Sequence, residues 1–560
     1  MNMSVQPLTP RERILGLLPQ RTDWTVVRRA PRRDLVAGLT VAIVALPLAL
    51  AFGVTSGLGA QAGLVTAVVA GLVAAVFGGS NLQVSGPTGA MTVVLVPVVH
   101  QFGAQGVFMV GAMAGVLLIA MALARLGRYV RYLPMPVVEG FTAGIAAVIA
   151  LQQVPAALGV AGAEGEKVWQ VAMDAVRQFA SAPALAPLLI AGAVATTMLL
   201  GARLRPGVPF SLIAIAGSTL LVAVLGVDAA LLGTIPSGIP APTLGFLDPG
   251  ALRTLLPSAL AVAALAALES LLSATVADGM SVDQRHDPDR ELFGQGLANL
   301  AAPVFGGLPA TAAIARTAVN VRAGASSKLA AVVHALALAV IVFSAGPLVA
   351  HIPLAALAGV LLATTVRMVD PAALRALARS TRGDAAVLAL TFGVTVAFDL
   401  VTAVAVGVGV AIVLALRAVA RTASFDEVPL DLRDHSAEEH ALLSERIVAY
   451  RPAGPLFFAA ANRFLTDVED VEVLILRMSQ ITTMDATGAS LLGEAITHLE
   501  RRGIAVLISQ ITDEHHELFA TLGVAQNLRG RGRVFADTPS AIAYARELIK
   551  TQAPRALQAA

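Results

Sequence analysis

Hydrophobic residues dominate the chain from about residue 35 to about residue 420 and come in closely spaced segments. Many of these segments are long enough to cross the roughly 30 Å hydrocarbon layer of a bilayer as a helix. We expect about seven spans in each half of this region. The segments are 35–56, 61–78, 87–99, 104–124, 136–157, 184–201 and 208–226, then 254–277, 291–306, 311–321, 328–348, 352–368, 384–400 and 401–420.

Two of these segments, 87–99 and 311–321, are too short to cross a bilayer and are opened by a Gly/Pro break. The same tetrapeptide, Val-Phe-Gly-Gly, precedes both, at 76–79 and at 304–307. Irregular backbone at membrane depth is tolerated only where it is buried in protein or lines a cavity. A matched pair of such interruptions in the two halves is typical of a transporter's binding site. Because a helix start offers free N–H groups and a positive dipole end, two facing starts predict an anion site.

Composition agrees with a polytopic membrane protein. Of the 560 residues, 56% are hydrophobic and 14% are charged, far from soluble composition. The net charge of +2 gives no case for a nucleic-acid partner. The absence of cysteine excludes disulfides, cysteine-ligated iron–sulfur clusters and thiolate zinc sites. We expect no cofactor beyond a coupling ion.

Charge asymmetry orients the chain. No cleavable signal peptide is visible, and residues 1–33 are arginine-rich, so we expect a cytoplasmic N-terminal arm. The loops that then fall inside are basic, with Arg125, Arg128, Arg131, Arg203, Arg205, Arg285, Arg290, Arg322, Lys328, Arg367, Arg375, Arg379 and Arg382. An even number of spans places both termini in the cytoplasm. An odd number in each half makes the halves inverted, so the starts of the two short segments meet.

The character of the chain changes after Arg421. We expect a transmembrane domain at 34–421, a polar, acidic linker at 422–445, a soluble α/β domain at 446–551 and a tail at 552–560. Within the α/β domain, buried strands at 471–478 and 503–509 flank an amphipathic helix at 488–502, which makes a βαβ unit. A helix near 513–522, a strand near 533–535 and a helix near 539–550 follow.

Several motifs, in their order, resemble the sulfate permease (SulP) family, relatives of the animal solute-carrier anion exchangers. The membrane part carries the resemblance at 37–52, 83–89, 136–144, 269–274 and 316–320. The C-terminal part resembles a STAS domain at 454–458 and 484–488. The resemblance implies a seven-plus-seven inverted-repeat fold in which core spans 1–4 and 8–11 move against gate spans 5–7 and 12–14. It also implies a homodimer, an elevator motion and substrates such as sulfate, bicarbonate, chloride and dicarboxylates.

Glu269 lies in the middle of a span, where a carboxylate costs roughly 3 kcal/mol unless it faces a cavity or a partner. One interpretation is a coupling site, in which Glu269 binds a proton or, with Ser273 one turn later, contributes to a sodium site. The resemblance supports this interpretation because many members carry Asp or Glu there. The alternative is a carboxylate that packs helices through hydrogen bonds. A carboxyl is readily neutralised by a proton, which favours protons over sodium.

Arg316 lies one turn into the second short segment and can bind an oxyanion or add positive charge beside the helix start. The alternative is an ion pair with Glu269 that neutralises both groups. Small residues of the two segment starts should frame the anion through their N–H groups, although small residues also serve helix packing. The predicted substrate-binding residues are Phe52, Thr88, Gly89, Ala90, Ala313, Ala315 and Arg316. Phe52 should contribute shape and dryness.

Other polar groups carry weaker hypotheses. Glu139, Asp278 and Asp399 lie near span ends, where capping explains them, and Gln152 and Gln153 could face the cleft from the gate. In the STAS-like domain, Thr487 matches a position that is phosphorylated in bacterial anti-sigma-factor antagonists, and a simple cap is the alternative. Phosphorylation there would imply a regulatory partner.

The sequence therefore predicts a secondary active transporter of a small anion in the inner cell membrane, proton- or sodium-coupled. Sulfate is the first candidate, because relatives carry Phe where Thr88 aligns and the resemblance thus implies a roomier, more polar pocket; bicarbonate and C4-dicarboxylates also fit. An uncoupled exchanger or channel of the same family and a nucleobase permease on the same fold are the alternatives. No nucleophile–base pair, nucleotide loop or zinc site is evident, so we expect no enzyme.

Overall fold

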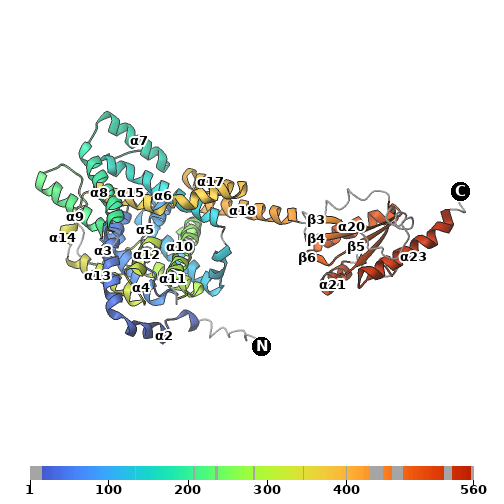
Figure 1. Cartoon of the computed structure of the whole chain (residues 1–560). Helices are drawn as coiled ribbons and strands as arrows, with labels where there is room; N and C mark the ends of the chain where they lie inside the picture. The colour runs from blue at the N-terminus through green and yellow to red at the C-terminus, as the bar shows by residue number, and fades with distance from the viewer. Residues whose placement is uncertain are drawn as a thin grey trace. The chain divides into compact units, whose positions relative to one another are not determined.

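The structure of the protein is a computed structural model. It describes residues 15–132, 134–205, 208–233, 238–281, 284–344, 346–398, 400–422, 424–428, 446–456, 471–522 and 532–556. The chain divides into two compact units, 1–409 and 410–560. The first is a body of packed helices and the second contains a mixed sheet with helices on it (Figure 1).

One group of helices in the first unit packs together and is called here the core bundle. Within it, α11 packs against α4 and α5, α13 packs against α3 and α4, and α10 packs against α5 and α12. The core bundle consists of α3 (Pro31–Thr55), α4 (Ala60–Phe77), α5 (Gly89–Leu123), α10 (Leu252–Met280), α11 (Pro288–Val304), α12 (Ile314–Arg322) and α13 (Leu329–Ser344).

A second group, called the gate bundle, is centred on α6 and α15. Helix α6 packs against α15 and α17, and α15 packs against α8. The gate bundle consists of α6 (Met135–Leu158), α8 (Leu185–Leu204), α9 (Phe210–Leu225), α15 (Leu354–Met368) and α17 (Arg382–Ala397). Helix α18 (Leu400–Thr422) follows. Apart from α18, the two bundles contain the spans that the family resemblance assigns to core and gate, and α3 contacts α9 and α15 across their boundary.

The observed helices match the expected spans closely. The expected segments 87–99 and 104–124 are the two parts of α5, which breaks at Gly103 with φ 65° and ψ −165°. The expected segment 328–348 is α13 followed by the short α14 (Gly346–Val349). Seven helices among the described residues are long and apolar enough to cross a membrane, and shorter apolar helices such as α9 and α13 accompany them.

Three helices lie where the sequence suggested only arm or loop. They are α2 (Arg21–Thr25), α7 (Val168–Ser181) and α16 (Pro371–Ser380). Helix α7 is amphipathic and too polar to register as a span, and α16 starts at an Asp370 cap followed by proline. The sequence did not predict these helices, because only one face of each is apolar and their residues therefore resemble polar loops.

The second unit is built on strands β3 (Ser424–Val428), β4 (Ile447–Leu456), β5 (Val473–Arg477), β6 (Gln480–Met484), β7 (Ala505–Ser509) and β8 (Val534–Phe535). The strand order is β3-β4-β5-β7-β8, with β6 also paired to β4, and only β3 runs antiparallel to its neighbour. Helices α20 (Ala486–Arg501), α21 (Asp513–Thr521) and α23 (Thr538–Ala556) complete it. The predicted βαβ unit is confirmed, whereas β3 falls in residues expected to be linker.

Candidate substrate and ion-coupling site

A two-stranded antiparallel ladder joins the starts of the two short helices. Strand β1 (Ser85–Gly86) pairs with β2 (Thr311–Ala312), and Gly86 lies opposite Thr311. Helix α5 begins three residues after β1, and α12 begins two residues after β2. The N-termini of both helices therefore lie at one place, as the sequence predicts. The strand pair itself was not predicted, because two residues give no alternation pattern.

Glu269 is tied to the start of α5. Thr88 is the N-cap of α5: its hydroxyl accepts a hydrogen bond from Met91 N–H at 3.4 Å and donates one to Oε2 of Glu269 at 2.9 Å. Glu269 is only partly buried, whereas Thr88 is buried. A partly open carboxylate in an otherwise apolar span can take up a proton or a cation.

Ser273 lies one turn after Glu269 on α10 and is fully buried. Its hydroxyl donates to Oγ1 of Thr317 at 3.0 Å, and Thr317 also accepts from Val84 N–H at 3.2 Å. One turn earlier, the hydroxyls of Ser270 and Thr311 lie 2.8 Å apart. These contacts fix α10 against β2 and α12. Glu269 and Ser273 thus lie on the helix that runs past both short-helix starts.

Arg316 is 1% exposed and points back to the start of the other short helix. Its Nη2 donates to the carbonyl oxygen of Pro87 at 2.8 Å, and a Cβ on Gly86 would lie 2.5 Å from its Nη1. In the described part of the chain no ion pair joins Arg316 to Glu269, and Nη1 has no hydrogen-bond partner. Arg316 therefore adds positive charge at the start of α5 and is not neutralised by a direct ion pair.

Phe52 and Gly89 meet at a contact with the gate bundle. A Cβ on Gly89 would lie 3.2 Å from Cε1 of Phe52 and 2.2 Å from Cδ1 of Ile149 in α6. Gly89 therefore allows α3, α5 and α6 to approach closely at the site. A hydrogen bond of 3.3 Å from Gln153 to Thr55 also joins the gate bundle to the core bundle.

The remaining predicted binding residues differ in their availability. The N–H of Ala313 donates to the carbonyl oxygen of Val84 at 3.1 Å, so this group is already used by the strand connection. Ala90 is buried, and Ala315 is exposed at the start of α12. The N–H of Ala313 is therefore not available to an anion at this helix start.

Sequence reasoning missed a set of polar side chains that hold the broken backbone. Glu291, Gln295 and Asn299 lie on α11 at spacings of four residues and share one face. Glu291 accepts from Gly79 N–H at 2.9 Å, Gln295 donates to the Ser85 hydroxyl at 2.6 Å, and Asn299 bonds both N–H and C=O of Ala310 at 2.8 Å. The polar stripe in an otherwise apolar helix was the available signal.

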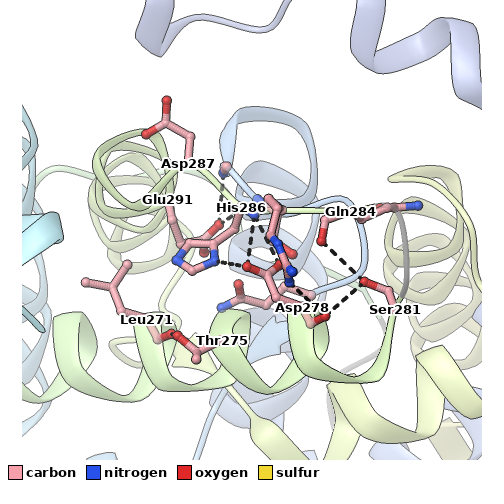
Figure 2. A network of polar contacts seen from close by, with 12 residues as sticks. Leu271, Thr275, Asp278, Ser281, Gln284, His286, Asp287 and Glu291 are labelled. Atoms are coloured by element: carbon pink, nitrogen blue, oxygen red, sulfur yellow. Dashed lines mark hydrogen bonds and ion pairs between the residues drawn. The ribbon is translucent and has the colours of Figure 1, made fainter. Parts of the chain in front are cut away.

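The charged end of α10 is structural. Asp278 accepts hydrogen bonds from the backbone N–H and ring of His286, the latter at 2.8 Å, and Gln284 donates to the carbonyl oxygen of Ser326 at 2.7 Å. Figure 2 shows Asp278, Ser281, Gln284 and His286 gathered at this end. The capping interpretation of Asp278 fits these contacts, whereas Asp399 lies outside the described residues.

In the second unit, Asp485 is the N-cap of α20 and accepts a 2.7 Å hydrogen bond from Gly488 N–H. A simple cap was the alternative to phosphorylation of Thr487, and a cap is present here. The side chain of Thr487 lies outside what the structure describes.

Two half-helices that start together within a body of apolar helices define a multi-pass membrane transporter, and the arrangement is consistent with two inverted repeats of seven spans. The sulfate permease family model matches residues 32–391, and the STAS domain model matches residues 441–541. The chain therefore belongs to the sulfate permease family and carries a STAS domain.

Relatives and solved structures agree with this family. A Bacillus subtilis protein named "Putative sulfate transporter YvdB" is 34% identical over 88% of this chain and 94% of its own. The bicarbonate transporter BicA of Picosynechococcus is 31% identical over 83% of this chain and 86% of its own. The structure titled the transmembrane domain of a cyanobacterium bicarbonate transporter BicA matches with a TM-score of 0.63 and 33% identity, over 67% of this chain and 98% of that one. The structure of SLC26A9 matches with a TM-score of 0.81 at 16% identity, over 97% of this chain and 94% of that one, and this shows the fold alone.

Proposed function

We propose that the protein is a secondary active transporter that carries a small oxyanion, with sulfate the first candidate, together with a proton or a sodium ion. The observation that carries the proposal is the hydrogen bond of 2.9 Å between Thr88, the N-cap of α5, and Glu269. It places a carboxylate beside the helix start that would attract the substrate. Substrate and carboxylate would then compete for the same positive end.

This competition supplies a coupling mechanism. Two like unit charges about 4 Å apart repel by about 4 kcal/mol at an effective dielectric constant near 20. An ionised Glu269 therefore opposes the binding of an anion at the start of α5, and a bound proton or sodium ion removes that opposition. Arg316 holds part of the compensating charge, because its Nη2 bonds Pro87 directly before Thr88.

The choice of anion rests on the polarity of the site and on the relatives. Thr88, Arg316 and two helix starts suit a tetrahedral or planar oxyanion, and the named relatives include proteins called sulfate and bicarbonate transporters. Sulfate remains first because YvdB shares the higher identity, and bicarbonate and C4-dicarboxylates follow. An uncoupled exchanger or channel would have no use for Glu269, and a nucleobase permease would lack the STAS domain.

An elevator motion fits the separation of the two bundles. The core bundle carries Thr88, Glu269 and Arg316, and the gate bundle contacts it near the site through Ile149 and Gln153. Close to the site the boundary thus includes an apolar contact and a hydrogen bond, and contacts of this kind can be exchanged for others when the core bundle slides. We further propose a homodimer in the inner cell membrane with both termini cytoplasmic and a regulatory partner for the STAS domain.

The direct test is uptake of labelled sulfate, bicarbonate and fumarate into proteoliposomes under imposed proton or sodium gradients. We expect uptake of one anion to be stimulated by one of the gradients. Uptake that is indifferent to both gradients would favour the uncoupled exchanger. Uptake of a nucleobase but of no anion would favour the permease.

A further inference from the structure

His334 on α13 is a buried polar residue that the proposed transport cycle does not use. It is 1% exposed, and neither ring nitrogen has a hydrogen-bond partner among the described residues. A neutral imidazole carries one donor and one acceptor, and nearly all buried polar groups in proteins are partnered. The imidazole therefore needs a partner other than the described side chains and backbone groups, such as a buried water.

The position of α13 places His334 behind the strand pair. Helix α13 packs against α3 and α4. At Gly71 of α4, a Cβ would lie 3.2 Å from the carbonyl oxygen of Ser85 in β1 and 3.9 Å from Cβ of Ala335. Ala335, the residue next to His334, and Ser85 of β1 therefore both lie against Gly71. Ala331, one turn before His334, shares a buried apolar cluster with Val84, and Val319 of α12, one turn after Arg316, packs against the same cluster.

Arg316 has a matching unused group on this side. Its Nη2 is bonded to Pro87, while Nη1 is buried against the backbone of Gly86 with no hydrogen-bond partner in the described chain. Nη1 can only donate, and a neutral imidazole nitrogen can accept. A buried water that bonds two or more polar groups is the common way to join such a pair when they do not touch.

We propose that His334 is a positioning residue for Arg316: its imidazole accepts a hydrogen bond, relayed by one buried water, from Nη1, and so holds the guanidinium at the start of α5. The inference rests on the role proposed above for Arg316 in binding the anion. His334 does not touch the substrate in this account. It fixes the direction of the donor that does.

A double-mutant cycle tests the link without any transport. The thermal midpoint of the purified full-length protein is measured for wild type, His334→Leu, Arg316→Met and the double variant, with no added anion. We expect non-additive shifts, with His334→Leu destabilising wild type but not the Arg316→Met background. His334→Gln, which keeps a polar group, should retain part of the stability. Thr391→Val, which alters a buried unpartnered hydroxyl of the gate helix α17, is the matched control and should add to Arg316→Met.

Additive shifts in the first cycle would overturn the inference. So would a higher midpoint for His334→Leu, because an imidazole with no partner gains from apolar replacement. If Arg316→Met does not fold, Arg316→Lys takes its place in the same cycle.

The second measurement concerns the anion. His334→Leu should raise the half-saturating concentration of the transported anion roughly tenfold, the loss expected for a misplaced hydrogen bond to a charged group, and change the maximal rate less. An unchanged half-saturation in a transporting protein would contradict the inference. If wild type transports no anion, the proposed function fails, and the cycle still decides the link between His334 and Arg316.

Discussion

Thr88 Oγ1 and Glu269 Oε2 lie 2.9 Å apart, and Thr88 is also the N-cap of α5. One hydroxyl thus links the only carboxylate in the middle of α10 to the helix start that faces the second short helix. A change in the charge of Glu269 is therefore felt where the anion is proposed to bind.

The first prediction concerns this hydroxyl. Thr88→Val keeps the shape of the side chain but removes the donor to Glu269 and the cap of α5. We expect uptake at subsaturating anion to fall about tenfold or more, since a cap and a charge-assisted hydrogen bond are lost together. Thr88→Ser keeps the hydroxyl and should retain most of the activity. Equal uptake by Thr88→Val and wild type would show that the bond has no part in transport.

The second prediction concerns the close approach of Arg316 to β1. A Cβ on Gly86 would lie 2.5 Å from Nη1, so Gly86→Ala must displace the guanidinium. We expect a folded protein whose half-saturating anion concentration rises by at least about tenfold. Gly192→Ala is the control, because nothing lies within 4 Å of a Cβ at that glycine. The measurement is concentration-dependent uptake, and identical curves for both variants would refute the role of Arg316.

The third prediction tests motion between the bundles. The chain contains no cysteine, so a single pair can be introduced without background. Thr55→Cys with Gln153→Cys places thiols where a 3.3 Å hydrogen bond now joins core to gate. Cross-linking this pair should stop uptake, and a reductant should restore it.

The matched control pair is Asp278→Cys with His286→Cys, which joins the end of α10 to the segment before α11 within the core bundle, where Oδ2 of Asp278 and Nδ1 of His286 are 2.8 Å apart. Cross-linking it should leave uptake intact. Full-rate uptake by the cross-linked Thr55–Gln153 pair would rule out sliding of the core bundle.

The fourth prediction concerns the N-terminal arm. Asp23 in α2 forms an ion pair with Arg290, and its Oδ2 lies 3.9 Å from Nζ of Lys328. Burial raises the pKa of Asp23, but the hydrogen bonds from Arg290 and Gln20 N–H and the charges of Lys328 and Arg290 outweigh burial, so the pKa lies below its ordinary value. Ionised Asp23 therefore stabilises the folded protein.

The stabilisation by ionised Asp23 is complete at a pH above the pKa of about 3.9 that Asp23 has in the unfolded chain. It is lost as the pH falls through the lower pKa of Asp23 in the folded protein. Asp23→Asn should lower stability by about 1–3 kcal/mol near neutral pH, and the difference from wild type should disappear in acid. Thermal midpoints from pH 3 to pH 8 measure this, with the exposed Asp228→Asn as control. A difference that grows in acid would contradict the assignment.

The sequence carried enough information to predict the spans, the two breaks and the residues beside them. Hydrophobic length and the repeated Val-Phe-Gly-Gly placed the starts of α5 and α12, and the isolation of Glu269 in an apolar helix marked it. These features are local, and local patterns are read reliably.

The sequence could not predict which hydrogen-bond partner each polar group at the site would have. It left open whether Arg316 pairs with Glu269 or binds an oxyanion and adds positive charge beside the helix start, and the structure directs Nη2 to Pro87. It also gave no sign that the N–H of Ala313 would be used by Val84. Such choices depend on how β1 and β2 meet across more than two hundred residues of chain, which no local pattern encodes.

The most direct measurement is proton- or sodium-driven uptake of labelled sulfate and bicarbonate into proteoliposomes by wild type and Glu269→Gln. The account predicts that an inward gradient of one cation stimulates uptake by wild type. It also predicts that Glu269→Gln loses this stimulation while still exchanging the anion, because a permanently neutral side chain no longer opposes anion binding. Gradient-driven uptake that survives unchanged in Glu269→Gln would contradict the proposal that this carboxylate couples the cation to the anion.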